Sequence, residues 1–88
     1  MTFAVEITPE GTRHLHRLPP KVLDAAASLI FGALAENPQQ VGKPLVGELE
    51  GLWSARRGDY RIVYEIDDDR AVVVVHRIQH RADAYRPR

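Results

Sequence analysis

The sequence predicts an α+β domain in which a mostly antiparallel four-stranded sheet carries an N-terminal helical hairpin on one face. Apolar residues first alternate with small or polar ones and then recur at helical spacing as far as residue 36, and three strand-like runs separated by short turns follow. The expected order of elements is therefore β-α-α-β-β-β. Because 88 residues can form only one sizeable core, residues 1–88 are expected to make a single domain.

The first strand and the first helix are predicted from the N-terminal residues. In FAVEI, residues 3–7, the side chains of Phe3, Val5 and Ile7 would share one face of a strand. A helix is expected over about residues 9–17, because Thr8 can cap a free backbone N–H and proline suits the first helical position.

The second helix has the clearest pattern and is expected over about residues 20–36. Its apolar stripe recurs every three or four residues, at Val22, Ala26, Leu29 and Ala33. Asn37-Pro38 is expected to end it, because the residue before a proline disfavours helical backbone.

Residues 37–51 contain three glycines and two prolines, which predicts a loop. Four apolar side chains in this segment suggest that the loop packs on the core. They are Val41, Leu45, Val46 and Leu49.

Three strands joined by tight turns are expected in the second half, over about residues 52–56, 60–66 and 71–78. In the middle strand Tyr60, Ile62, Tyr64 and Ile66 would share one face, and Arg61, Val63 and Glu65 the other. A basic residue on the face away from the larger apolar set indicates a functional surface. The terminal residues 80–88 would form a short helix or an extended tail.

Composition favours a small cytoplasmic protein that does not enter a membrane. Hydrophobic residues make up 44 % and charged residues 27 % of the chain, and no apolar run approaches the ~20 residues of a membrane span. The first residues, MTFAVEITPEG, lack the basic and apolar parts of a secretion signal. Cysteine is absent, which excludes disulfides and thiolate metal sites.

The net charge of zero hides two basic segments. Residues 51–64 carry three arginines and one acid, and residues 76–88 carry four arginines and one acid. A guanidinium presents a planar fork of donors that matches a phosphate, so these segments favour binding to a phosphate-bearing partner. The alternative is that the arginines are solvated or form surface salt bridges.

The ordered motifs LPPKV before the long helix, ARRGDYRIVYEID in the middle and HRADAYR near the end resemble the RelE branch of the RelE/ParE toxin superfamily. The likeness covers essentially the whole chain, and the middle block is its most specific part. It implies the toxin of a type II toxin–antitoxin pair, which enters the ribosome and cleaves mRNA in the A site without a metal or other cofactor. A cognate antitoxin would silence it.

The same resemblance implies a set of catalytic residues. Arg61 and Arg81 match the family's phosphate-clamping arginines, and Tyr85 matches a C-terminal tyrosine that could stack on a base or transfer a proton. His80 is a candidate acid or base, because histidine readily exchanges a proton near neutral pH. The structural alternatives are an ion pair between Arg61 and Glu65, and a Tyr85 ring that anchors the tail.

Further arginines are expected to bind the RNA backbone. They are Arg56, Arg57, Arg77 and Arg86. Trp53 could stack on a base, but core packing is favoured for a tryptophan in a strand of a small domain. The remaining histidines, His14, His16 and His76, form no recognisable set of metal ligands.

The chain departs from the family pattern at two positions of the second expected strand. Relatives carry lysines there, including a proposed general base, whereas this chain has Leu52 and Ser54. Proton transfer would then fall to His80 or Tyr85, or catalysis would be weak. Two other functions remain open, namely a ParE-like inhibitor of DNA gyrase and a non-toxic antitoxin-binding corepressor.

Overall fold

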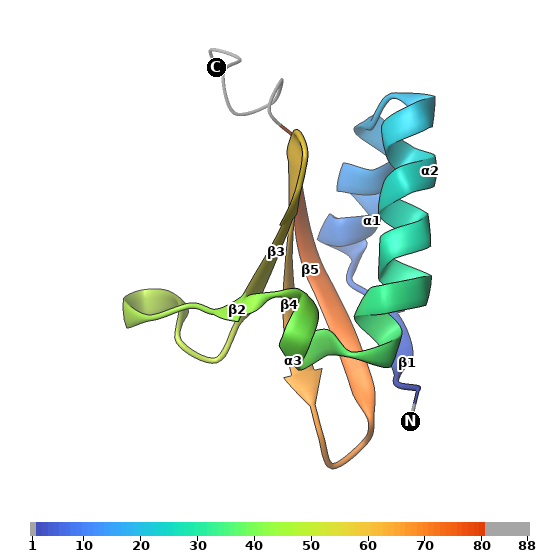
Figure 1. Cartoon of the computed structure of the whole chain (residues 1–88). Coiled ribbons are helices and arrows are strands. Elements are labelled where there is room, and N and C mark those ends of the chain that lie inside the picture. Colours follow the sequence, from blue (N-terminus) through green and yellow to red (C-terminus); the bar gives the residue numbers. More distant parts are fainter. Residues whose placement is uncertain (1, 81–88) are drawn as a thin grey trace.

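The computed structural model describes residues 2–80 and places the helices on one side of a sheet (Figure 1). The elements follow in the order β1 (Ala4–Ile7), α1 (Pro9–Arg17), α2 (Pro20–Leu29), the π-helical turn η1 (Ile30–Leu34), α3 (Pro38–Val41), β2 (Lys43–Pro44), the 3-10 turn η2 (Gly47–Leu49), β3 (Trp53–Arg57), β4 (Tyr60–Asp67) and β5 (Val72–His80). No helix within this part of the chain is long and apolar enough to cross a membrane.

The sheet has five strands in the order β1-β5-β4-β3-β2, which corrects the predicted four-stranded sheet. Strands β2 to β5 are antiparallel neighbours, but β1 pairs with β5 in parallel. The additional strand β2 has two residues, too few for an alternating pattern to reveal it. The direction in which β1 pairs depends on how the intervening helices return the chain, which local alternation does not encode.

Helix α1 occupies the predicted residues and covers the free edge of β5 beyond the end of β1. The Thr8 hydroxyl caps the helix by accepting a hydrogen bond from the Gly11 backbone N–H at 3.0 Å. The same hydroxyl donates to the His76 carbonyl at 3.2 Å, and the Ile78 backbone N–H donates to His14 Nδ1 at 3.0 Å. The expected hairpin therefore contacts an edge of the sheet as well as one face.

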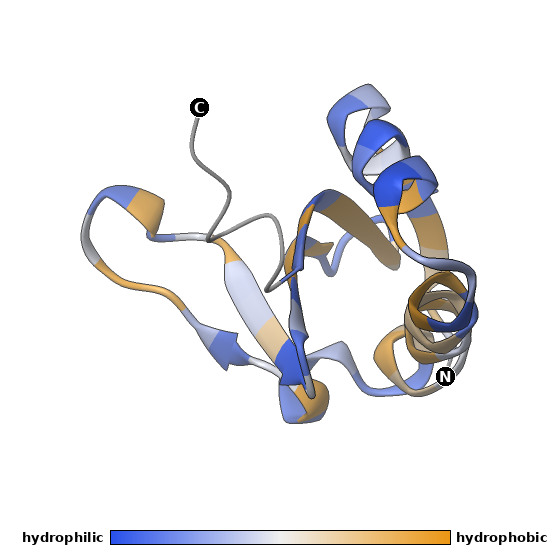
Figure 2. Cartoon of the chain, turned by 90° about the horizontal axis from the view of Figure 1, so that it is seen from above, coloured by the Kyte–Doolittle hydropathy of each residue, from blue (hydrophilic) through white to orange (hydrophobic). Residues whose placement is uncertain are grey.

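The long helix ends after residue 36, as predicted, but a π-helical turn interrupts it at Ile30–Leu34. Four of its buried residues, Ala26, Leu29, Ile30 and Leu34, face the sheet. The strands contribute buried residues to the same core, including Ile62, Tyr64, Val73, Val75 and Ile78. Figure 2 shows hydrophobic segments of the helix and of the strands lying opposite one another.

The segment over residues 37–51 only partly matches the expectation. Val41 and Leu45 are partly buried, but Val46 is 84 % and Leu49 47 % exposed, so the prediction that these two pack on the core is wrong. They lie in the stretch after β2 that stands out from the sheet (Figure 1). Apolar residues in a segment rich in glycine and proline lack a periodicity that would specify a buried face.

The start of this segment is held tightly by the core. The Tyr64 hydroxyl donates a hydrogen bond to the Pro38 carbonyl at 2.6 Å and is fully buried. Gly42 lies against the same hydroxyl, and a Cβ atom added there would clash with Tyr64 Oη and come within 2.7 Å of the Ser54 carbonyl oxygen. This close approach sets the position at which β2 joins β3.

Candidate functional site

A pair of arginines lies side by side on the face of the sheet that is turned away from the helices. Arg56 of β3 is directly opposite Arg61 of β4, and Gln79 of β5 is opposite Arg61 on the other side. Tyr60 and Ile62, the neighbours of Arg61 along the strand, are buried against the helices, so Arg61 points to the open face. Arg56 and Arg61 are both exposed.

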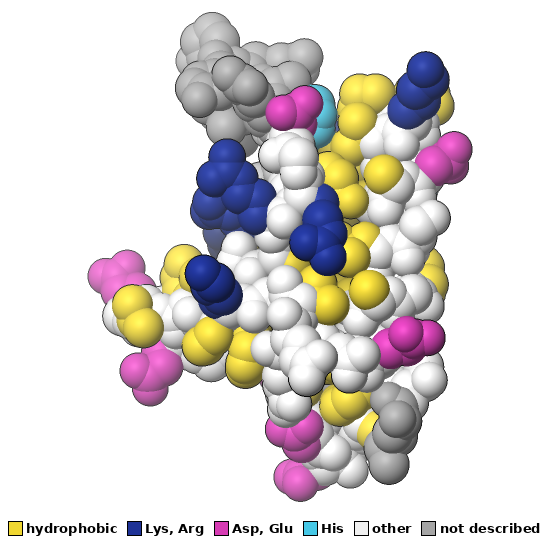
Figure 3. Space-filling model, viewed as in Figure 1, with side chains coloured by type: hydrophobic (Ala, Val, Ile, Leu, Met, Phe, Trp, Pro, Cys, Tyr) yellow, Lys and Arg dark blue, Asp and Glu magenta, His cyan; other side chains and the backbone are white. Residues whose placement is uncertain are grey.

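A second row of the open face crosses the sheet two residues away. It joins Lys43 of β2, Ser54 of β3, Val63 of β4 and Arg77 of β5. Figure 3 shows Lys and Arg side chains gathered on this side of the sheet. We call the cationic residues of the two rows, Lys43, Arg56, Arg61 and Arg77, the basic face.

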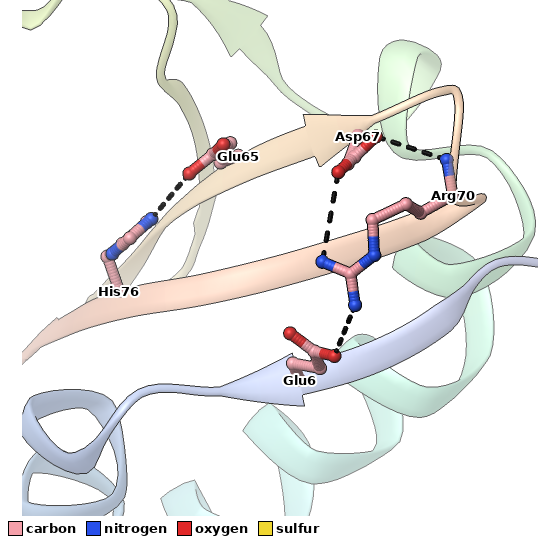
Figure 4. Close-up of polar contacts among 5 residues, drawn as sticks. All are labelled: Glu6, Glu65, Asp67, Arg70 and His76. Carbon is pink, nitrogen blue, oxygen red and sulfur yellow. Dashed lines mark hydrogen bonds and ion pairs between the residues drawn. The ribbon is translucent and has the colours of Figure 1, made fainter.

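The two arginines that face each other carry no ion pair with any carboxylate in residues 2–80. The predicted alternative partner of Arg61, Glu65, instead contacts His76 Nε2 through its Oε1 at 2.9 Å (Figure 4). Like charges directly opposite each other on a sheet are destabilising. An anion bound between the guanidinium groups would remove that repulsion.

At the other end of the open face, the positive charge of Arg70 is paired with carboxylates of the same chain. Arg70 lies 3.0 Å from a Glu6 carboxylate oxygen and 3.8 Å from one of Asp67 (Figure 4). His76 sits where the register of β4 and β5 shifts, and this bulge lets its ring reach Glu65. Anion binding is therefore favoured at the arginine end of the face.

The structure separates the predicted RNA-binding arginines. Arg57 lies opposite Tyr60 and thus on the helix side, whereas Arg56 is on the open face. The positive charge of Arg57 lowers the pKa of the Tyr60 phenol, but burial has the larger effect and raises it. Arg77 is on the open face and is partly neutralised by Glu10, at 3.6 Å from its Nε.

The terminal candidates are only partly placed. His80 is the last residue of β5 and lies opposite Tyr60, which puts it on the helix side of the strand rather than beside Arg61. Arg81, Tyr85 and Arg86 lie outside the described residues. Trp53 is on the helix side, with its ring stacked at 6.5 Å from that of Tyr64 and packed against the core, as predicted.

Metal ligands do not gather within residues 2–80, where no three His, Cys, Asp or Glu side chains lie close enough to hold an ion. Cleavage without a metal stays a prediction.

The sequence interpretation did not single out Lys43, because a two-residue strand leaves no recognisable pattern. The sequence contains the lysine but does not show that it lies opposite Ser54 across the sheet.

Solved structures share the arrangement of a sheet covered by helices on one face. The isolated E. coli RelE toxin superposes with a TM-score of 0.74 over 89 % of this chain and 83 % of that chain, at 16 % identity, which shows the shared fold alone.

Sequence comparison identifies the family. Residues 5–85 match the ParE toxin of the type II toxin–antitoxin system parDE. Toxin RelG of Mycobacterium tuberculosis is 50 % identical over 86 residues, covering 98 % of this chain and 99 % of its own. Toxin RelE of the same organism is 49 % identical over 84 residues, covering 96 % and 87 %. The chain belongs to this toxin family, in the RelE-like superfamily, and is a type II toxin.

A solved relative supports the same assignment at the level of structure. The toxin–antitoxin complex RelBE2 of M. tuberculosis contains a chain that superposes with a TM-score of 0.90 at 47 % identity, over 92 % of this chain and 100 % of that chain.

Proposed function

We propose that this toxin is a ribosome-dependent endoribonuclease that cleaves mRNA in the ribosomal A site without a metal ion. The observation that carries the proposal is the exposed pair of Arg56 and Arg61, which face each other without a carboxylate partner among residues 2–80. Such a pair fits an RNA phosphate, whose oxygens accept hydrogen bonds from guanidinium groups. The similarity to toxins named RelG and RelE supports the same function.

In the proposed reaction the ribose 2′-oxygen attacks the adjacent phosphorus and the bond to the 5′-oxygen breaks, which leaves a cyclic phosphate and a free 5′-hydroxyl. The 2′-hydroxyl must lose a proton, the leaving oxygen must gain one, and the phosphorane between them carries extra negative charge. Arg61 stabilises that charge, with Arg56 beside it. Arginine holds its proton too tightly to be an ordinary base.

Proton transfer and the remaining charge stabilisation belong to the end of the chain in this proposal. Arg81 adds a second clamping guanidinium, and Tyr85 or His80 exchanges the protons. His80 lies opposite Tyr60, on the helix side of β5. Arg77 and Arg86 would contact neighbouring parts of the RNA backbone, whereas Arg57, on the helix side of β3, would reach only RNA that passes around the end of the strand.

The proposed partners are the ribosome with its mRNA and a cognate antitoxin protein, and the proposed location is the cytoplasm. Two solved relatives, RelBE2 of M. tuberculosis and RelBE of E. coli, are toxin–antitoxin complexes. An antitoxin that covers the basic face would block RNA binding directly.

Expression of this chain alone in bacteria, followed by primer extension on an abundant mRNA, tests the proposal. We expect growth arrest and in-frame cuts that disappear when translation is blocked. Arg61→Ala should lower cleavage about a hundredfold or more, because it removes a charge that stabilises the transition state. Arg70→Ala is the matched control, because Arg70 is on the same face but pairs with Glu6 and Asp67.

The same experiment distinguishes the proposed nuclease from the two alternative functions. Full cleavage and arrest with Arg61→Ala would contradict the proposed role of the arginine pair. The family model is named for a ParE toxin, so inhibition of DNA gyrase is the second candidate. Arrest with a DNA damage response and no mRNA cuts would favour it, and harmless expression would favour an antitoxin-binding corepressor.

A further inference from the structure

Lys43 occupies a place on the basic face that its position in the sequence does not reveal. It is directly opposite Ser54 across the β2–β3 pair, and pairing continues where the Leu45 backbone N–H donates to the Leu52 carbonyl at 2.8 Å. Residues opposite each other in a sheet project to the same face. The Lys43 side chain is exposed and leaves the sheet beside Ser54.

The spacing of a β-sheet brings Lys43 within reach of the arginine pair. Diagonal neighbours on adjacent antiparallel strands lie about 7–8 Å apart, which applies to Lys43 and Arg56. Arg61 is one strand further, so its Cα lies about 12 Å from that of Lys43, given strands about 4.8 Å apart and about 3.4 Å per residue. Extended lysine and arginine side chains can span these separations and meet at one phosphate.

The backbone on which Lys43 sits is fixed by the core. The preceding residue, Gly42, lies against the buried Tyr64 hydroxyl, which itself donates to the Pro38 carbonyl at 2.6 Å. The stretch that stands out from the sheet begins only after Pro44. Lys43 is therefore held to the sheet, and binding an anion would require ordering of its side chain alone.

The charges around Lys43 favour an anion. No carboxylate in residues 2–80 forms an ion pair with the Lys43 ammonium group. The neighbouring row on the same face carries Arg56 and Arg61. The other lysine of the chain, Lys21, lies on α2 and takes no part in this face.

We propose that Lys43 supplies, from the edge strand β2, an ammonium group that binds RNA beside the arginine pair. It contacts the phosphate held by Arg56 and Arg61 and stabilises the negative charge that develops there. This inference rests on the proposed nuclease function. Lys43 acts as a charge in this role, so its proton need not be transferred.

The test is single-turnover cleavage of a defined mRNA on purified ribosomes by the purified toxin. Lys43→Ala should lower the rate about tenfold or more, since a charge-assisted contact to the phosphate is lost. Lys43→Arg should retain most of the rate, because the charge is kept. Lys21→Ala is the control and should match the wild type.

A second variant tests the location of the charge. Adding Ser54→Lys to Lys43→Ala returns an ammonium group to the adjacent strand on the same face, and it should restore cleavage to within a few-fold of wild type. An unchanged rate for Lys43→Ala, or failure of Ser54→Lys to rescue it, would overturn the inference. Circular dichroism spectra of each variant check that the fold is kept.

Failure of the proposed role of Lys43 can be distinguished from failure of the proposed nuclease function. If Arg61→Ala abolishes cleavage while Lys43→Ala does not affect it, the nuclease assignment stands and the role of Lys43 is wrong. If the wild-type protein does not cleave programmed mRNA at all, the proposed function fails first.

Discussion

Gly42 illustrates how a single residue positions the basic face. Its φ of −117° is open to any amino acid, so the requirement for glycine comes from space alone. The Tyr64 hydroxyl and the Ser54 carbonyl leave no room for a methyl group. Tyr64 is held by its hydrogen bond and Ser54 by strand pairing, so neither can move away cheaply.

Gly42→Ala is therefore expected to lower the free energy of unfolding by about 1–3 kcal/mol, the usual cost of overpacking. The measurement is urea unfolding followed by circular dichroism. Gly32→Ala is the matched control, because a Cβ at Gly32 meets nothing within 4 Å and alanine favours helical backbone. Equal stability of the Gly42→Ala variant and the wild type would show that β2 can shift without cost.

Three arginines of β3 and β4 show which part of the site could be predicted from the sequence. Arg61 could be assigned to the open face from the alternation in YRIVYEI, and the structure places it there. Arg56 and Arg57 are adjacent and looked equivalent, yet they point to opposite faces. Knowing which of two neighbours faces outward requires the register of β3 against β4, because the turn between them can be closed in more than one way.

At the scale of elements, α1 completes the sheet where β1 ends. The Ile78 backbone N–H has no strand partner at the edge of β5, and His14 Nδ1 of α1 accepts its hydrogen bond at 3.0 Å. A part-buried N–H without an acceptor is costly, so this contact fixes the helix against the strand that leads to the C-terminal residues.

Replacing His14 by alanine should lower the free energy of unfolding by about 1 kcal/mol and speed hydrogen exchange of the Ile78 amide. The comparison variant is His16→Ala, which changes an exposed histidine two residues further along the helix and should be close to neutral. Amide exchange followed by NMR reports the contact directly. Exchange at Ile78 as slow as in the wild type would mean that another group protects it.

At the scale of the whole molecule, a tyrosine in the core links stability to alkaline pH. Burial raises the pKa of the Tyr64 phenol from 10.0 to about 12, and its contact with Gly42 lowers it by a smaller amount. The unfolded chain would ionise this phenol near pH 10, whereas the folded protein would resist ionisation. The contribution of Tyr64 to the free energy of unfolding is thus fully present below pH 10 and is lost as pH rises through 12.

The expected loss between pH 9 and 12 is about 2–3 kcal/mol for Tyr64, from the difference between the two pKa values. Urea unfolding at a series of pH values measures it. Tyr64→Phe should be about 1 kcal/mol less stable at neutral pH but should lose less stability on going to high pH. Part of the alkaline loss should persist, because burial also raises the pKa of Tyr60. An identical pH dependence in the two proteins would rule out Tyr64 as its source.

Local patterns alone determined most of the secondary structure and the existence of a basic face. The Thr8-Pro9 start of α1, the end of the long helix before Pro38 and the alternation around Arg61 are properties of neighbouring residues, since capping, proline geometry and strand period act over a few positions. The motifs of the middle block also sufficed to indicate the toxin family, which the comparisons confirm.

Tertiary structure alone decided the parallel pairing of β1, the small strand β2 and hence the place of Lys43 beside Ser54. These features bring together residues that are far apart in the chain or too few to form a pattern. Their energies come from a buried tyrosine, a close backbone approach and a shared sheet edge, and such terms exist only after the whole chain has folded.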